Sequence, residues 1–193
     1  THASGVAASL FSVQFGNGLF VAAGNGVILT STNGVSWVAS PKSAVGEVSF
    51  GNGVFLMLGG RGTNWVSVDA ANWFVRPSGT DQDRYTMGFG GGSFLAIDLN
   101  LRTFVSPDAS NWVQQTSVTV GRPADVAYGN GHFVTGGSGG MQYSQGGVGW
   151  KLAAAACLPR GICFGNGTFV AVGFAEAIVQ SDPVVWLNPQ ADG

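Results

Sequence analysis

A short pattern, an aromatic residue followed by Gly, then Asn or Gly, then Gly, recurs five times and constrains the fold more than any other feature. The copies begin at Phe15, Phe50, Phe89, Tyr128 and Phe164, so their intervals are 35, 39, 39 and 36 residues. A Phe stands two positions after each copy, and a Trp follows each aromatic residue by about 22 residues. Self-similarity at this period is typical of repeat arrays and propellers. The five copies take up nearly all of the 193 residues.

Each copy predicts four short β-strands. In the first copy, residues 11–15 form a strand, and Asn17-Gly18 forms a two-residue hairpin turn because Asn and Gly tolerate the positive φ that such turns need. Strands over residues 19–23 and 27–31 follow, and Trp37 opens the fourth. No segment shows a sustained apolar period of 3.6 residues, so we expect negligible helix.

Four strands in about 40 residues are typical of a β-propeller blade. We therefore predict an all-β chain, a five-bladed β-propeller with four short antiparallel strands per blade, as a single domain over residues 1–193. The expected blades, numbered 1 to 5 below, cover residues 1–42, 43–80, 81–118, 119–156 and 157–193. Closure is expected to rest on side-chain packing between the first and fifth blades. A β-solenoid and a larger ring assembled from two chains are the alternatives.

The turn between the third and fourth strands carries a second motif. Its copies run over residues 31–37, 67–73, 106–112, 144–150 and 180–186, and each ends in Trp. The first reads Ser31-Thr32-Asn33-Gly34-Val35-Ser36-Trp37. The motif resembles the Asp-box, or bacterial neuraminidase repeat (BNR), of sialidases and many non-enzymatic propellers, although the family pattern Ser-x-Asp-x-Gly-x-Thr-Trp is one residue longer. At the position of the family's Asp, four of the five copies are aligned with an Asp or Asn, and the remaining copy has Gly146.

The Asp-box motif is expected to be structural. An Asx side chain can bond backbone amides two residues ahead and hold the hairpin, and we assign this role to Asp69, Asp108 and Asp182. The Trp side chain is expected to be buried in apolar surroundings, and Trp112→Ala is expected to lower the free energy of unfolding by about 3–5 kcal/mol. Fifteen of the 22 aromatic residues occupy slots that repeat in every copy, which favours packing between blades over a sugar-stacking role.

Composition excludes several functions. Charged residues make up 9% of the chain, hydrophobic residues 45%, and the formal net charge is −2. These values exclude a basic nucleic-acid surface and a polybasic membrane patch as main functions. No apolar run approaches the roughly 20 residues of a membrane span, so no membrane insertion is expected. Because the chain begins at Thr1 without a basic and apolar leader, we expect a mature or excised form.

The cysteines and histidines are too few for a metal site. Cys157 and Cys163 form either a short-loop disulfide or a pair of free thiols, and the sequence leaves both open. His2 and His132 are the only histidines, and neither forms a spaced pair with the cysteines, so we expect no zinc site and no cofactor.

The charged residues gather in loops that differ between the copies. In a propeller, the loops between second and third strands and those between blades share one face, which is the default ligand site by analogy of fold. Asp98 stands where the other copies have Gly, so we expect a role in binding and nearly unchanged stability in Asp98→Ala. Solvated charges that keep the chain soluble are the alternative. The candidate ligand-binding residues are Arg61, Asp81, Asp83, Arg84, Asp98, Arg102, Arg122, Asp125 and Glu176.

We predict a secreted or cell-surface binding module, most simply a lectin-like, carbohydrate-binding one. Because the variable loops do not repeat, one asymmetric site is expected. The alternative is a protein-interaction or assembly scaffold, similar to the Asp-box-like propellers that aid photosystem II assembly. A glycosidase or sialidase-like enzyme is less favoured, because the chain lacks the Arg-Ile-Pro segment of sialidases and two histidines assemble no nucleophilic triad. The expected partner is a glycan or a cell-surface protein, bound by a monomer or small homo-oligomer without enzymatic activity.

Overall fold

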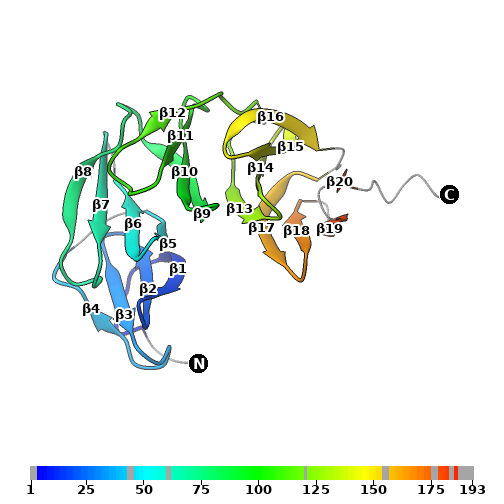
Figure 1. The fold of residues 1–193 in the computed structure, drawn as a ribbon. Helices are drawn as coiled ribbons and strands as arrows, with labels where there is room; N and C mark the ends of the chain where they lie inside the picture. The colour runs from blue at the N-terminus through cyan, green and yellow to red at the C-terminus, as the bar shows by residue number, and fades with distance from the viewer. Residues whose placement is uncertain are drawn as a thin grey trace. The chain divides into compact units, whose positions relative to one another are not determined.

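The computed structural model describes residues 4–42, 46–59, 62–119, 121–153, 157–174, 178–182 and 185–186. These residues form twenty β-strands in five four-stranded antiparallel sheets, and no helix is found among them (Figure 1). In each sheet the strands are adjacent in chain order. The prediction of an all-β, five-bladed β-propeller chain is therefore confirmed.

The sheets follow the predicted blade ranges. Blade 1 has β1 (Leu10–Gly16), β2 (Leu19–Gly24), β3 (Ile28–Ser31) and β4 (Val38–Ala39). Blade 2 has β5 (Val48–Gly51), β6 (Val54–Leu58), β7 (Thr63–Ser67) and β8 (Phe74–Pro77). Blade 3 has β9 (Arg84–Gly90), β10 (Ser93–Asp98), β11 (Thr103–Ser106) and β12 (Val113–Gln114). Blade 4 has β13 (Asp125–Gly129), β14 (His132–Gly137), β15 (Gly140–Gln145) and β16 (Val148–Ala153). Blade 5 has β17 (Pro159–Gly165), β18 (Thr168–Gly173), β19 (Ile178–Asp182) and β20 (Val185–Trp186).

The first hairpin of each blade forms as the repeat predicts. In blade 1, Phe15 pairs with Phe20 across the turn, and the two turn residues have positive φ, 47° at Asn17 and 77° at Gly18. The Gly that precedes the Asn is required for a different reason. The Phe50 ring of blade 2 lies where Gly16 would carry a Cβ, so any larger residue would collide with the neighbouring blade.

The chain divides into two compact units, Thr1–Arg84 with Ser106–Trp112, and Tyr85–Val105 with Val113–Gly193. In the first unit, blades 1 and 2 pack through a core that includes Val21, Ile28, Phe55 and Met57. The second unit has two such cores. Blades 3 and 4 meet at Leu95, Ile97, Val126 and Phe133, and blades 4 and 5 at Val134, Met141, Ile162 and Phe169. Within each unit, successive blades thus pack face to face.

The turn between third and fourth strands is held by its Asx residue in blades 1 to 3. Asn33 Oδ1 accepts hydrogen bonds from the backbone nitrogens two and three residues ahead, both at 2.9 Å. Asp69 and Asp108 accept the corresponding bonds at 2.7–2.9 Å. These hydrogen bonds lower the pKa of both carboxyl groups. The structural role predicted for Asp69 and Asp108 is confirmed.

The role predicted for Asp182 concerns a side chain that lies outside the described part of the structure, but the strand register around it is described. Val170 pairs with Gln180 in blade 5 as Val21 pairs with Thr30 in blade 1. Ser181 therefore takes the place of the motif's Ser, and Asp182 stands one position before the Asx site. The physical reason is that the blade 5 turn is one residue shorter. The Asx residue is present in three blades instead of four.

The two cysteines are free thiols, Cys157 buried and Cys163 exposed. Of the two states left open by the sequence, the structure shows the one without a disulfide. Burial raises the pKa of the Cys157 thiol.

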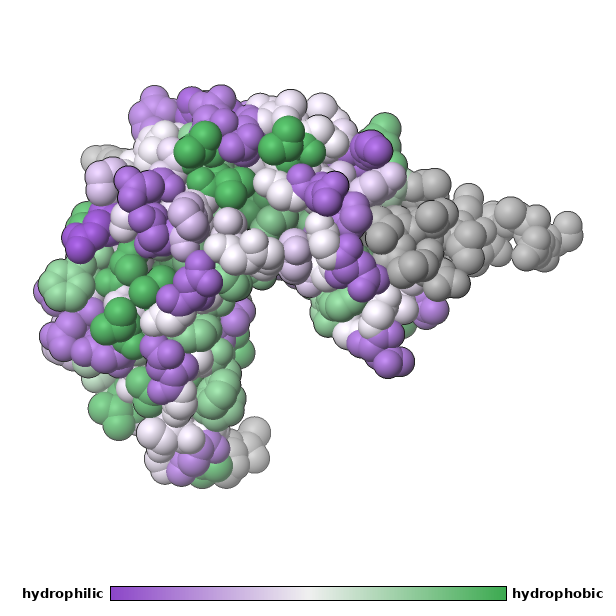
Figure 2. All heavy atoms as spheres, in the orientation of Figure 1, coloured by the Kyte–Doolittle hydropathy of each residue, from purple (hydrophilic) through white to green (hydrophobic). Residues whose placement is uncertain are grey.

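Several exposed hydrophobic side chains lie on the last strand of a blade, which is an edge strand of its sheet. Examples are Val38, Phe74 and Val113, which are 67%, 56% and 61% exposed. On the face drawn in Figure 2, hydrophobic residues are interspersed with hydrophilic ones. No helix in the described part of the chain could cross a membrane.

Candidate functional site

A pocket of about 190 Å³ lies on the variable-loop face of the second unit, between blades 4 and 5. Its wall comes from the connection that enters β13, the β14–β15 loop, the start of β17 and the β18–β19 loop. Its lining residues are Arg122, Ala124, Gly137, Ser138, Leu158, Pro159, Arg160 and Phe174. The pocket thus lies in the class of loops that the sequence predicts to hold a ligand.

Close backbone packing positions these loops. The Ala124 nitrogen donates to the Gly136 oxygen at 2.8 Å, which fixes the connection against the end of β14. A Cβ at Gly137 would collide with the carbonyl oxygen of Arg122, so only Gly allows the two segments to approach so closely. The same relationship holds in blade 5, where the Leu158 carbonyl lies against Gly173.

Two guanidinium groups give the pocket its charge. Neither Arg122 nor Arg160 forms an ion pair with any residue that the structure describes. The Arg160 guanidinium carbon lies 4.5 Å from the centroid of the Phe174 ring, a distance at which a cation is attracted to the ring face. This contact orients the Arg160 side chain toward the pocket wall.

The backbone at Arg122 is strained. Its φ is +22°, in a region that residues with a Cβ rarely adopt. Such strain costs free energy and is found most often at binding and catalytic sites. The strained position carries one of the two positive charges of the pocket.

The arrangement suits an anionic ligand. A guanidinium binds carboxylate or phosphate through paired hydrogen bonds, while Leu158, Pro159 and Phe174 supply apolar contact. No cluster of three or more His, Cys, Asp or Glu residues that could hold a metal ion occurs among the described residues.

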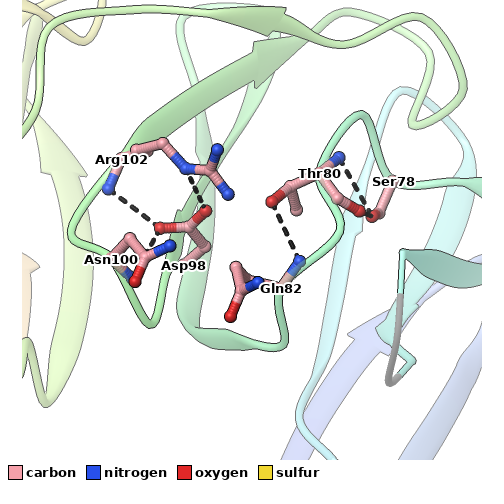
Figure 3. Close-up of polar contacts among 6 residues, drawn as sticks. All are labelled: Ser78, Thr80, Gln82, Asp98, Asn100 and Arg102. Carbon is pink, nitrogen blue, oxygen red and sulfur yellow. Dashed lines mark hydrogen bonds and ion pairs between the residues drawn. The ribbon is translucent and has the colours of Figure 1, made fainter.

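Asp98 and Arg102 lie together in the β10–β11 loop of blade 3 and form an ion pair, with Asp98 Oδ2 2.7 Å from Arg102 Nε (Figure 3). Asp98 Oδ1 accepts from the backbone nitrogens of Asn100 and Arg102, both at 2.9 Å. The Asp98 side chain is fully buried. It therefore holds the loop together, and these contacts lead us to expect that Asp98→Ala lowers the stability, in place of the nearly unchanged stability expected from the sequence.

Asp125 links blades 4 and 5. Its Oδ1 accepts from the Val126 nitrogen at 2.8 Å, and its Oδ2 accepts from the Ile162 nitrogen of blade 5 at 2.7 Å. Burial raises the pKa of this carboxyl group, against the effect of the two hydrogen bonds. Ser12 bonds the Val48 nitrogen at the equivalent place between blades 1 and 2. The Asp125 side chain thus forms a hydrogen bond between blades 4 and 5.

The remaining candidate residues lie elsewhere. Asp81 and Asp83 are exposed in the connection before β9, beyond a turn in which the Gln82 nitrogen donates to Thr80 Oγ1 (Figure 3). Arg84 is the first residue of β9, but its side chain lies outside the described part of the structure, as do the whole of Arg61 and Glu176. Of the candidates whose side chains the structure describes, Arg122 alone lines the pocket.

Arg160 and Phe174 were not among the candidates for the site. A signal was present, because Phe174 is one of seven aromatic residues outside the repeating slots, and Arg160 is one of the charged residues of the variable loops. What the sequence does not show is that these two loops place the guanidinium over the ring.

The comparisons with known proteins place the chain in the propeller class. No protein-family model matches the chain, and no curated protein matches its sequence. The structure of YCF48 bound to a D1 peptide is similar with a TM-score of 0.72 at 15% identity, over 95% of this chain and 69% of that one. A nidogen–laminin complex gives 0.71 at 11% identity, over 91% and 76%. The computationally designed Ika8 protein gives 0.67 at 10% identity over 92% of this chain, which spans 59% of the designed protein's length. The TM-scores show a common fold, and the Asp-box resemblance stays a prediction.

Proposed function

We propose that the chain is a non-enzymatic binding module that holds an acidic segment of a partner protein in the pocket between blades 4 and 5. One observation carries the proposal: Arg122 and Arg160 line the same pocket, and neither is ion-paired with a described residue. Two guanidinium groups that line one pocket and have no acidic partner among the described residues can bind carboxylates.

The pocket favours a charged ligand over a neutral sugar. A sugar ring would stack on an open aromatic face, whereas the Arg160 guanidinium lies over the Phe174 ring at 4.5 Å. Among the described lining residues, Ser138 alone has a side-chain hydroxyl group, so these residues offer few neutral groups to bond sugar hydroxyls. Leu158, Pro159 and Phe174 suit the apolar residues that flank an acidic side chain in a peptide.

The structural neighbours are in keeping with a protein ligand. YCF48 is described as bound to a D1 peptide, and another neighbour is described as a complex of nidogen and laminin. The proposal keeps the predicted extracellular or cell-surface location. Carbohydrate binding, the first expectation from the sequence, is the competing function, and a carboxylated sugar is the form of glycan that best fits two arginines.

Parallel binding screens test the proposal. The purified chain is exposed to a random peptide display library and to a glycan array with neutral and sialylated members, together with the variant Arg122→Gln/Arg160→Gln. We expect enrichment of peptides with Asp or Glu beside apolar residues, and loss of that enrichment in the variant. Binding of glycans alone, or peptide binding that the variant retains, would contradict the proposal. Hydrolysis of aryl glycosides or sialosides by the chain would overturn its non-enzymatic part.

A further inference from the structure

The Asn of the first hairpin turn joins neighbouring blades by its side-chain amide. Asn17 Nδ2 donates to the carbonyl oxygen of Gly53 at 2.9 Å and to that of Val68 at 2.8 Å, both in blade 2. Between blades 4 and 5, Asn130 Nδ2 donates to the Gly167 oxygen at 3.0 Å. Asn52 Nδ2 likewise donates to the Pro107 oxygen at 2.8 Å. A primary carboxamide is thus the group that this kind of junction accepts.

Blade 3 lacks this residue. Its turn has Gly91 at the position of the Asn, with the positive φ of 58° that the turn requires. A pocket of about 260 Å³ lies at this place in the second unit. It is lined by Gly91 of blade 3 and by Gly131 and Gln145 of blade 4. Gly131 is the repeat equivalent of Gly53 and Gly167, whose carbonyl oxygens accept the Asn amide elsewhere.

The wall of this pocket also differs from the other junctions. The turn aromatic of blade 4 is Tyr128, where blades 2 and 5 have Phe. A Cβ at Gly91 would lie only 2.7 Å from the Tyr128 hydroxyl oxygen, so an Asn of this chain does not fit there without a shift of the ring. The Tyr128 and Phe133 rings, 4.8 Å apart between centroids, give the pocket an apolar side. The site therefore combines a carbonyl acceptor, a hydroxyl group and aromatic rings.

We propose that the pocket between the turns of blades 3 and 4 binds the primary carboxamide side chain of an Asn or Gln residue from a partner protein. The incoming amide takes the place that Asn17 and Asn130 fill at their own junctions and donates to the Gly131 carbonyl oxygen. The β1–β2 and β3–β4 turns that form such junctions belong to a different set of loops from those around Arg122, so the inference is independent of the function proposed above.

The test compares two probes that differ in one group. The ¹⁵N-labelled chain is titrated with N-acetyl-Gly-Asn-Gly-N-methylamide and with the same peptide in which Asp replaces Asn, and the amide signals are followed by NMR. We expect saturable shifts with the Asn peptide at Gly91, Gly131 and Gly146, three glycines that line the pocket. The Asp peptide, which has no side-chain amide donor, is expected to bind about tenfold more weakly at these residues. Equal binding of both peptides, or no shift at these glycines, would overturn the proposal.

A variant that rebuilds the missing contact provides the control. Gly91→Asn with Tyr128→Phe copies the residues found between blades 1 and 2, and it should fold with an unchanged or higher Tm. Its own Asn side chain is expected to fill the pocket and abolish the shifts. If the folded double variant still bound the Asn peptide through the same glycines, the carboxamide would not occupy this pocket.

Discussion

The side-chain amide nitrogen of Asn17 lies 2.9 Å from the carbonyl oxygen of Gly53 in the next blade. This contact gives the turn residue a second role beside its tolerance of positive φ. Asn130 repeats the contact with Gly167. Both hydrogen bonds lie at the rim of the packed blade faces, so the repeat encodes the junction between blades as well as the turn.

Asn17→Gly separates these two roles. Glycine keeps the positive φ but removes the amide that bonds Gly53 and Val68, so we expect a loss of about 1–2 kcal/mol in the free energy of unfolding. Chemical denaturation followed by Trp fluorescence measures it. An unchanged stability would show that the amide contributes nothing beyond the turn. Gly already stands at the equivalent position of blade 3, Gly91, where the turn has a φ of 58° without the amide.

Asp98→Ala is expected to destabilise the chain by about 2–3 kcal/mol. The change removes a fully buried carboxylate that bonds two backbone nitrogens and pairs with Arg102 at 2.7 Å. Asp98→Asn keeps one acceptor oxygen and is expected to cost less. Thermal unfolding of both variants would check the order, and equal stability of wild type and Asp98→Ala would show that the loop does not depend on this side chain.

Trp73→Ala is expected to cost about 3–5 kcal/mol, as is typical of a fully packed Trp. Trp73 is 5% exposed, and its Nε1 donates to the Ala70 oxygen at 2.9 Å. Trp112 occupies the same slot but is half-buried, so Trp112→Ala is expected to cost less than the sequence alone suggested. Denaturation curves of the two variants measure the difference; a larger loss for Trp112 would contradict the burial argument.

Acid is expected to weaken the turns of blades 2 and 3. Hydrogen bonds lower the pKa of Asp69 and of Asp108 below the ordinary value of 3.8. A carboxyl group with a lowered native pKa stabilises the fold above its unfolded pKa, and that contribution is lost as the pH falls through the native pKa. The free energy of unfolding should therefore decrease as the pH is lowered below about 5.

Amide substitutions test the assignment of this pH dependence. Asn33 already makes the same backbone contacts in blade 1 without a titrating group, so Asp69→Asn/Asp108→Asn should fold and show a shallower decrease in acid. Asn33→Asp should make the decrease steeper. Equal slopes for all three proteins in urea denaturation from pH 6 to pH 2 would assign the pH dependence to other groups.

The sequence predicted those features that depend on contacts between residues close together in the chain, and it did not predict those that depend on contacts between separate segments. The turns at Asn17-Gly18 and around Asp69 were predictable because each is determined by contacts within a few residues. The burial of Asp98 was not predictable because it depends on how the loop folds back, and the register at Asp182 was not because its turn is one residue shorter than the others. The pairing of Arg160 with Phe174 joins two separate loops, which no local pattern records.

The most direct test of the proposed function is the affinity of the best acidic peptide from the display screen, measured by fluorescence anisotropy for the wild type, Arg160→Gln and Arg76→Gln. Arg76 is the matched control, because its guanidinium carbon lies 5.8 Å from the centroid of an exposed Phe74 ring outside the pocket. We predict that Arg160→Gln raises the Kd by at least about tenfold, as loss of a charge-assisted hydrogen bond implies, while Arg76→Gln leaves it unchanged. Equal affinities of the wild type and Arg160→Gln would contradict the proposal that the pocket lined by Arg122 and Arg160 is the binding site.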